Sequence, residues 1–171
     1  EKQTRRFDFR RGDLSDVLAD VQSIMAAPLA REGFGLTIQA EGVPVFAYDR
    51  EVLVQILINL MENSLKFGRH ASRKRIVITA AATGDRVDLS VSDTGPGIPK
   101  RALKHVFEDF YRVDDQMVRG TGGTGIGLAL VKKFVLAMGG RVWAKNNDGP
   151  GCTVGLSLPM QPEAVNREPK A

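Results

Sequence analysis

The chain has 171 residues, of which 43% are hydrophobic and 26% are charged, and its formal net charge is +4. This is the composition of a globular domain that can bury a core, and no apolar stretch reaches the roughly 18 residues that cross a bilayer. No basic run carries interleaved aromatic residues, which gives nucleic-acid binding no support, and the single Cys152 excludes an internal disulfide.

We expect one domain over residues 1–159, followed by a tail or linker over residues 160–171. A lone cysteine without metal-ligand spacing fits a reducing compartment, so we expect a cytoplasmic location. The chain begins at Glu1 without a methionine or a signal peptide. It is therefore expected to be a piece of a longer protein, attached to a membrane only through missing parts.

The first elements in the chain are a strand, a helix and two further strands. Phe7 and Phe9 alternate with charged residues, which predicts a short edge strand. Asp13 is a predicted N-cap for a helix that ends at Gly33 and that Pro28 should kink or interrupt. Residues 34–41 and 43–49 read as two strands. The apolar face of the helix is expected to hold Val17, Leu18, Val21, Ile24 and Met25.

A second helix over residues 51–67, capped by Asp49, carries two stripes at helical spacing. The polar stripe places Asn59, Asn63 and Lys66 on one face. The amide oxygen of Asn63 suits Mg²⁺ that arrives carrying phosphates, which Lys66 would meet one turn later. The alternative is a polar helix face with no ligand. The buried stripe is predicted to contain Leu53, Ile56, Leu57, Leu60, Met61 and Leu65.

A hairpin over residues 75–93, turning at Gly84, then delivers Asp93 into the sequence DTGPGIP. Two glycines and two prolines within six residues fix a rigid bend where a ligand can approach the backbone. Asp93 is either a turn-initiating residue or a carboxylate that accepts a hydrogen bond from the amino group of a ligand.

Residues 100–112 are expected to form a short helix, and residues 112–123 a long mobile loop of the kind that serves as a lid. Gly123, Gly125 and Gly127 then lead into a helix through Leu136, whose free N-terminal amides would form an anion site. Two strands over residues 138–146 and 151–159 end the domain.

In this order, the chain resembles the catalytic ATP-binding domain of sensor histidine kinases, in the superfamily of gyrase and MutL. Four boxes match, together with the closing strand, over roughly Phe7 to Pro159: NLMENSLKF, DTGPGIP, VFEDFYR and GGTGIGL. The resemblance implies a two-layer α/β sandwich, the Bergerat ATP-binding fold, with a mixed, largely antiparallel sheet and helices on one face. It also implies ATP and Mg²⁺ as cofactors.

Family roles can be carried over residue by residue. The resemblance implies that Asn63 binds Mg²⁺, that Asn59 lies one turn earlier in the same pocket and that Lys66 contacts the phosphates. Phe67 would lie beside adenine, and Asp93 would accept a hydrogen bond from the amino group of adenine. The remaining cofactor-binding residues implied are Gly95, Gly97, Gly123, Gly125, Gly127, Leu128 and Thr153.

Two of these assignments are looser. Thr153 would support Asp93 directly or through water, and either Arg112 or Arg119 would reach the γ-phosphate. With Asn59 and Lys66, Arg112 completes the implied catalytic set.

Histidine kinases of this family phosphorylate a histidine in a His-Glu/Asp setting on a separate dimerisation domain. His70 and His105 are expected not to be that acceptor, because neither has an acidic neighbour or a long helical hairpin in the sequence. The expected partners are therefore the missing His-bearing domain and the receiver domain of a response regulator.

Other classes of nucleotide-binding protein are alternatives to a histidine kinase. A gyrase-like hydrolase needs a glutamate base four residues before the metal asparagine, where this chain has Asn59; Glu62 points about 100° away. A dinucleotide-binding G-x-G-x-x-G motif after a strand is not matched. A serine kinase of the anti-sigma-factor type and a non-catalytic nucleotide-sensing module remain alternatives.

Overall fold

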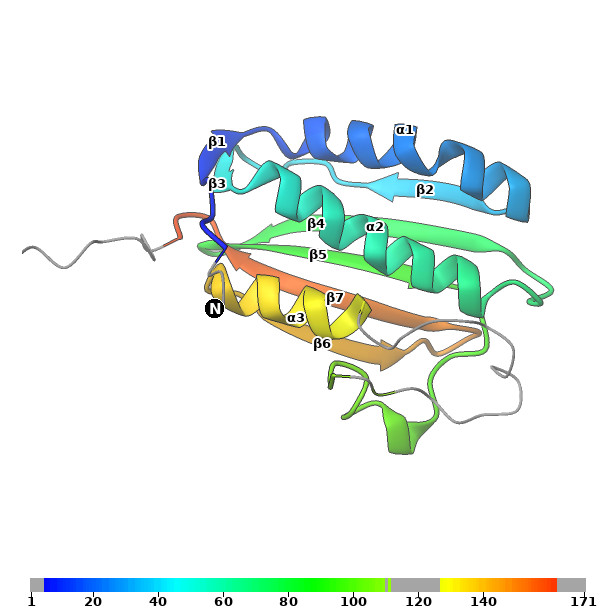
Figure 1. Ribbon diagram of the computed structural model, residues 1–171. Coiled ribbons are helices and arrows are strands. Elements are labelled where there is room, and N and C mark those ends of the chain that lie inside the picture. Colours follow the sequence, from blue (N-terminus) through cyan, green and yellow to red (C-terminus); the bar gives the residue numbers. More distant parts are fainter. Residues whose placement is uncertain (1–4, 110, 112–126, 163–171) are drawn as a thin grey trace, which may run out of the picture.

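The computed structural model describes residues 5–109, 111 and 127–162, which form a main sheet covered on one face by three helices and a small second sheet (Figure 1). The strands of the main sheet lie in the order β2-β4-β5-β7-β6. β2 pairs parallel with β4, and the other neighbours are antiparallel. The predicted α/β sandwich with a mixed, largely antiparallel sheet is confirmed. The main-sheet strands are β2 (Gly35–Gln39), β4 (Arg75–Thr83), β5 (Arg86–Asp93), β6 (Arg141–Asn146) and β7 (Cys152–Pro159).

A small second sheet pairs β1 (Arg10–Gly12) with β3 (Phe46–Tyr48). The predicted first strand is therefore shifted, because Phe7 and Phe9 precede β1. Their rings stack at 6.0 Å, and the ring of Phe7 meets the edge of Phe134 at 6.4 Å. These aromatic side chains cover the core beside α3 (Gly127–Ala137) rather than alternate across a strand.

The first helix, α1 (Leu14–Glu32), begins and ends as predicted. Asp13 caps it by accepting the backbone N–H of Ser15, and Gly33 ends it in the left-handed conformation at φ 74°. The helix is continuous through Pro28, so the predicted interruption is wrong. Met25 and Leu29 are buried on either side of that residue, and their packing offsets the missing hydrogen bond.

Ile24 was also placed wrongly on the apolar face of α1, because its side chain is 53% exposed. The buried residues of α1 follow a narrow stripe at three- and four-residue steps, and Ile24 lies just outside that stripe. The stripe consists of Leu14, Val17, Leu18, Val21, Met25 and Leu29.

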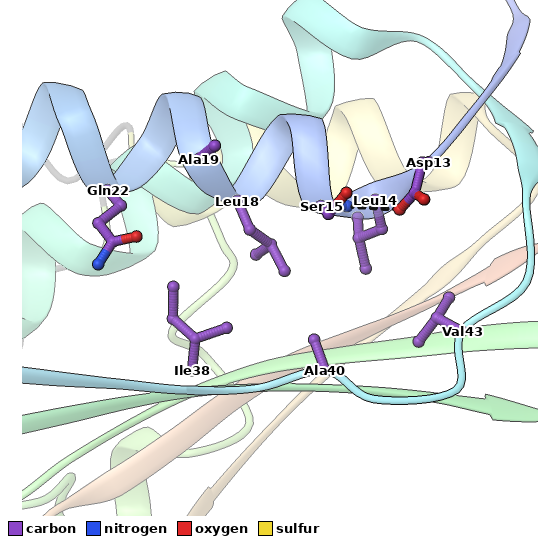
Figure 2. Close-up of a pocket in the computed structure, with 9 residues that line it drawn as sticks. All are labelled: Asp13, Leu14, Ser15, Leu18, Ala19, Gln22, Ile38, Ala40 and Val43. Atoms are coloured by element: carbon purple, nitrogen blue, oxygen red, sulfur yellow. Dashed lines mark hydrogen bonds between the residues drawn. The ribbon is translucent and has the colours of Figure 1, made fainter.

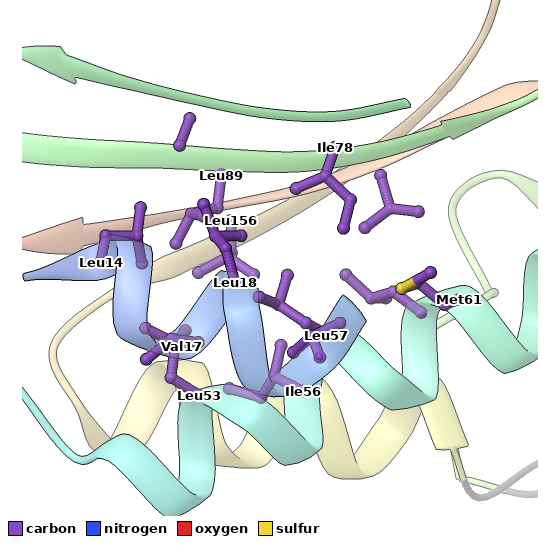
Figure 3. Close-up of a cluster of buried hydrophobic side chains, with 14 of the residues drawn as sticks. Leu14, Val17, Leu18, Leu53, Ile56, Leu57, Met61, Ile78, Leu89 and Leu156 are labelled. Carbon is purple, nitrogen blue, oxygen red and sulfur yellow. The ribbon is translucent and has the colours of Figure 1, made fainter. Parts of the chain in front are cut away.

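The central helix, α2 (Arg50–Phe67), supplies the largest part of the core (Figure 3). The carboxylate of Asp49 accepts the N–H of Val52 at 3.2 Å, which confirms the predicted cap. In Figure 3 the apolar side chains of α1 and α2 lie against those of the sheet, including Ile78, Leu89 and Leu156. Each buried aliphatic side chain contributes about 1.5–3 kcal/mol, so the buried stripe fixes the rotation of α2 and hence the direction of its polar stripe.

After β5, the described residues 100–109 do not form the helix predicted over residues 100–112. A short 3₁₀ helix, η1 (Lys100–Ala102), is followed by successive turns. Their hydrogen bonds link residues three apart, as in His105 N–H to the oxygen of Ala102 and Glu108 N–H to the oxygen of His105. The hairpin turn at Gly84 is as predicted, and the helix through residue 136 and the last two strands are found with ends shifted by one to three residues.

Over the part of the chain that the structure describes, no helix has the length and apolarity required to cross a membrane.

Candidate functional site

The predicted polar stripe and the predicted glycine-led helix meet in the structure. Asn59, Asn63 and Lys66 are half-buried along α2. A Cβ built on Gly127, the first residue of α3, would lie 3.9 Å from both amide atoms of Asn63. The N-terminus of α3 therefore faces the Asn63 side chain, and its free amides favour an anion there. Gly123, Gly125, Arg112 and Arg119 lie outside the described residues.

The second part of the candidate site is built around Asp93, the last residue of β5. Its side chain is only 9% exposed and faces the helices. Oδ1 accepts the N–H of Gly95 at 2.9 Å, and Oδ2 accepts the hydroxyl of Ser64 at 3.0 Å. Asp93 thus joins the sheet to α2, and the assignment of Ser64 to the site was missed by the sequence analysis.

The glycines of the loop over residues 93–99, hereafter the base loop, are required by close contacts. A Cβ on Gly95 would lie 3.1 Å from Oδ1 of Asp93 and 3.3 Å from the Cα of Gly68. Gly97 has φ 77°, a conformation that other residues rarely adopt. Phe67, at the end of α2 just before Gly68, is partly exposed, with Nζ of Lys66 5.2 Å from its ring centroid. The base loop and the end of α2 therefore line one edge of the site.

Two asparagines hold the base loop in place, Asn146 at the end of β6 and Asn147 in the turn that follows, and the sequence analysis missed both. The amide of Asn146 accepts the N–H of Ile98 and donates to its carbonyl oxygen, each at 2.7 Å. The amide of Asn147 donates to the carbonyl oxygen of Asp93 at 3.0 Å. Such amide clamps have no sequence signal, because any exposed turn favours asparagine.

The predicted direct hydrogen bond from Thr153 to Asp93 is not found, and the predicted route through water stays a prediction. The hydroxyl of Thr153 lies 2.6 Å from Oδ1 of Asn147 and 3.0 Å from Oγ of Ser92. It therefore braces the backbone of Asp93 through Asn147 and does not bond the carboxylate. The reason is the strand register, since Thr153 pairs with Ser92 and consecutive residues of a strand face opposite sides.

The residue beside the carboxylate of Asp93 is instead Cys152. Its N–H lies 3.5 Å from Oδ1, and its Sγ lies 3.7 Å from Oδ2. Burial, with a smaller contribution from the charge and the hydrogen bond of Asp93, raises the pKa of the Cys152 thiol to about 12. The thiol is therefore neutral at physiological pH and is a poor nucleophile.

The expectation that neither histidine has an acidic neighbour is wrong for His105. Nδ1 of His105 lies 2.7 Å from Oε1 of Glu108, and the ring of Tyr111 lies 5.3 Å away. The tight turns after η1 bring residues three apart together, whereas the sequence analysis considered only adjacent positions. The second part of the expectation holds, because this segment consists of short turns rather than a long helical hairpin.

A separate groove of about 360 Å³ lies between α1 and β2 (Figure 2). Apolar side chains such as Leu18, Ile38 and Val43 surround it, and none of the predicted nucleotide-binding residues lines it. The predicted nucleotide site is therefore not this groove; its residues lie on α2, the base loop and α3.

The described residues contain no group of three or more His, Cys, Asp or Glu side chains that could hold a metal ion. A metal at this site would need ligands from a bound molecule in addition to Asn63.

Residues 48–162 match the family model described as histidine kinase-, DNA gyrase B-, and HSP90-like ATPase. The chain belongs to this ATPase family. The match spans α2, the base loop and the last strand, so the family resemblance drawn from the four boxes is confirmed.

Relatives within the family are sensor kinases. The sensor histidine kinase WalK of Bacillus subtilis is 38% identical over 115 residues, which cover 67% of this chain and 19% of WalK. The chain thus spans about a fifth of the length of the curated relatives that it matches.

Solved structures share the fold. Full-length ShkA in complex with AMPPNP superposes with a TM-score of 0.80 at 29% identity, over 94% of this chain and 33% of ShkA. The catalytic domain of the histidine kinase ThkA gives a TM-score of 0.78 at 23% identity, over 91% of this chain and 100% of that domain. ThkA has also been solved in complex with the response regulator TrrA.

Proposed function

We propose that this chain is the ATP-binding catalytic domain of a sensor histidine kinase, which binds Mg·ATP and transfers its γ-phosphate to a histidine on a separate dimerisation domain. The observation that carries the proposal is that a buried carboxylate, Asp93, and the helix end at Gly127 lie beside the same turn of α2, next to Ser64 and Asn63, respectively. The naming of the relatives as sensor kinases supports it.

Asp93 is suited to select adenine. Its carboxylate only accepts hydrogen bonds, so it matches the amino group of adenine and opposes the carbonyl oxygen that guanine carries at the same position. The short bonds from Gly95 and Ser64 hold it in place for this contact. Phe67 and the glycines of the base loop would enclose the base.

The phosphates would lie toward Asn63, Lys66 and the N-terminus of α3. Mg²⁺ commonly keeps one or two protein ligands and takes the rest from water and substrate phosphates, which fits a site with one amide and no carboxylate cluster. Asn63 would hold the ion, and the bound ion would neutralise negative charge on the phosphates. Lys66 and the helix-end amides would orient the γ-phosphate, since phosphoryl transfer depends chiefly on positioning and electrostatics.

In the transfer step, a ring nitrogen of the acceptor histidine forms a bond to the γ-phosphorus. The bond from that phosphorus to the oxygen shared with the β-phosphate breaks, and ADP leaves. The proton on the other ring nitrogen passes to an acidic neighbour or to water. Gly123, Gly125, Leu128 and an arginine at position 112 or 119 are proposed to contact the phosphates during this step.

The acceptor domain and the receiver domain of a response regulator are the proposed partners. Both lie outside this chain, which covers about a fifth of the WalK sequence. The ThkA complex with TrrA is a precedent for the second partner in a protein of this fold. We further propose a cytoplasmic location, with any membrane attachment through other parts of the protein.

Hydrolysis of the gyrase type is less favoured. Glu62 is exposed, whereas Asn63 lies against Gly127, so Glu62 does not face the proposed phosphate site.

Calorimetric titration with ATP and GTP, each with Mg²⁺ and with a chelator, tests the binding part of the proposal. We expect Mg²⁺-dependent binding with a preference for ATP. A hydrogen bond to a charged group contributes roughly 1.5–3 kcal/mol, so Asp93→Asn should weaken ATP binding by about ten- to over a hundredfold. Equal affinity for ATP and GTP would contradict the adenine assignment.

A further inference from the structure

Ser64 is a polar residue on the buried side of α2. It is 5% exposed and lies between the fully buried Met61 and the buried Leu65. A serine inside a helix commonly bonds the carbonyl oxygen four residues back, and alanine is the better helix former at a buried position. The Ser64 hydroxyl instead crosses to the sheet and donates to Oδ2 of Asp93 at 3.0 Å. The hydrogen bond to Asp93 therefore explains why a serine lies in the apolar stripe, whereas helix propensity does not.

The donors around Asp93 divide into two short bonds and two long contacts. An ionised carboxylate has about four acceptor positions, two on each oxygen. Gly95 takes one position on Oδ1 at 2.9 Å, and Ser64 takes one on Oδ2 at 3.0 Å. The other two contacts both come from Cys152, at 3.5 Å and 3.7 Å, and the thiol is a weak donor. The amino group of a ligand would compete only with these long contacts.

All four donors are neutral groups, and among the described residues no lysine, arginine or histidine forms an ion pair with Asp93. The orientation of the carboxylate is thus set by hydrogen bonds alone. Gly95 belongs to the base loop itself, so Ser64 is the short-bonded partner that ties the carboxylate to α2.

We infer that Ser64 is the positioning residue for base specificity: its hydroxyl fixes Oδ2 of Asp93 so that the carboxylate presents its free acceptor position to the amino group of the base. This inference rests on the proposed function and deepens it. Without the hydroxyl, one oxygen retains only the weak thiol contact and the carboxylate is free to rotate. Binding of an amino-bearing base then weakens, whereas binding of a base with an oxygen at that position is nearly unaffected.

The test compares Mg·ATP with Mg·ITP, whose hypoxanthine base carries an oxygen in place of the adenine amino group. Dissociation constants are measured by calorimetry for the unaltered chain, for Ser64→Ala and for Ser157→Ala. Ser157 is a matched control, because it is similarly buried at 7% exposure and makes a side-chain hydrogen bond, to Arg86, away from Asp93.

We expect Ser64→Ala to weaken ATP binding at least fivefold and to change ITP binding less than twofold, so that the ATP preference falls by a similar factor. Ser157→Ala should leave that preference within twofold. A merely structural role for Ser64 would weaken both nucleotides equally. An unchanged or increased ATP preference in Ser64→Ala, or equal losses for ATP and ITP, would overturn the inference while leaving the proposed function intact. Absence of ATP binding by the unaltered chain would overturn both.

Discussion

Asn146 and Ile98 are joined by two hydrogen bonds of 2.7 Å, which run in opposite directions between one side-chain amide and one backbone unit. The side-chain amide of Asn146 therefore pairs with the backbone N–H and carbonyl oxygen of Ile98 as a neighbouring strand would. Because Ile98 lies between Gly97 and Pro99, this pairing fixes the far end of the base loop against the β6–β7 turn.

Asn146→Ala should loosen the base loop. Each lost hydrogen bond is worth about 0.5–1.5 kcal/mol, so we expect ATP affinity to fall by roughly five- to a hundredfold. Hydrogen exchange of residues 94–98 should become faster, while the core strands keep their protection. Asp148→Ala, at an exposed position in the same turn, is the control and should change neither quantity. Unaltered protection of residues 94–98 in Asn146→Ala would contradict the clamp.

Gly151→Ala should disturb both stability and binding. Gly151 has φ 89°, and a Cβ there would overlap the backbone oxygen of Asp93. Left-handed strain and overpacking each cost roughly 1–3 kcal/mol, so we expect a loss of about 2 kcal/mol or more in the free energy of unfolding. Denaturant unfolding measures this loss. Gly149→Ala, where nothing lies within 4 Å, should be close to neutral, and an equal loss in both variants would argue against the contact with Asp93.

Asn63→Ala should damage Mg²⁺-dependent ATP binding and phosphate transfer more than folding. Its side chain is half-buried beside the N-terminus of α3 and lies outside the buried stripe, so the thermal midpoint should stay within a few degrees, as for other non-core substitutions. Gln55→Ala, an exposed position on the same helix, is the matched control. A collapse of the thermal midpoint in Asn63→Ala alone would favour a structural role for this asparagine.

Cys152 should be protected from thiol reagents in the folded chain. Its pKa is raised from an ordinary 9.0 to about 12, so the thiolate fraction at pH 8 is far smaller in the folded than in the unfolded state. We expect alkylation at pH 8 to be about a hundredfold slower, or more, than in denaturant. Fast alkylation of the folded chain would show that the thiol is not buried beside Asp93.

The same pKa shift predicts a loss of stability at high pH. As the pH rises from about 9 to about 12, the unfolded chain releases the thiol proton while the folded chain retains it, so the free energy of unfolding falls. Below pH 9 the thiol is protonated in both the folded and the unfolded chain, so it causes no loss of stability there. Comparing the denaturation midpoints of the unaltered chain and Cys152→Ala at pH 8 and pH 10.5 isolates this effect, because only the chain with the thiol carries it.

The chain alone should not label itself with phosphate from ATP, yet it should phosphorylate a separately purified domain that carries the acceptor histidine. The rate should rise with partner concentration, since the proximity that tethering supplies is missing. The His105–Glu108 pair makes His105→Ala the decisive variant. Acid-labile label on the lone chain that disappears in His105→Ala would show that this histidine is an acceptor.

The sequence by itself determined the features that depend on neighbouring residues. The caps at Asp13, Gly33 and Asp49 were predictable because each acts within one helical turn. The buried stripe of α2 was predictable because a period of 3.6 residues identifies one face of a helix. The order of the four boxes then indicated the family, and with it Asp93 and Asn63 as candidates.

Local patterns failed where packing outweighed propensity. Pro28 should interrupt α1, yet the helix continues because Met25 and Leu29 anchor it on both sides. Residues 100–112 carry a helical pattern, but the described residues 100–109 form a 3₁₀ helix and turns, and the contact between His105 and Glu108 exists only because of those turns.

Only the tertiary structure decided which side chains surround the carboxylate of Asp93. Ser64, Asn146 and Cys152 contact Asp93 or the base loop across 29, 48 and 59 residues of sequence, respectively. The choice of Cys152 over Thr153 depends on strand register, because a shift of one residue turns every side chain of a strand to the opposite face. Register is set by the packing of the whole sheet against α1, α2 and α3, and no local stretch of the sequence contains that information.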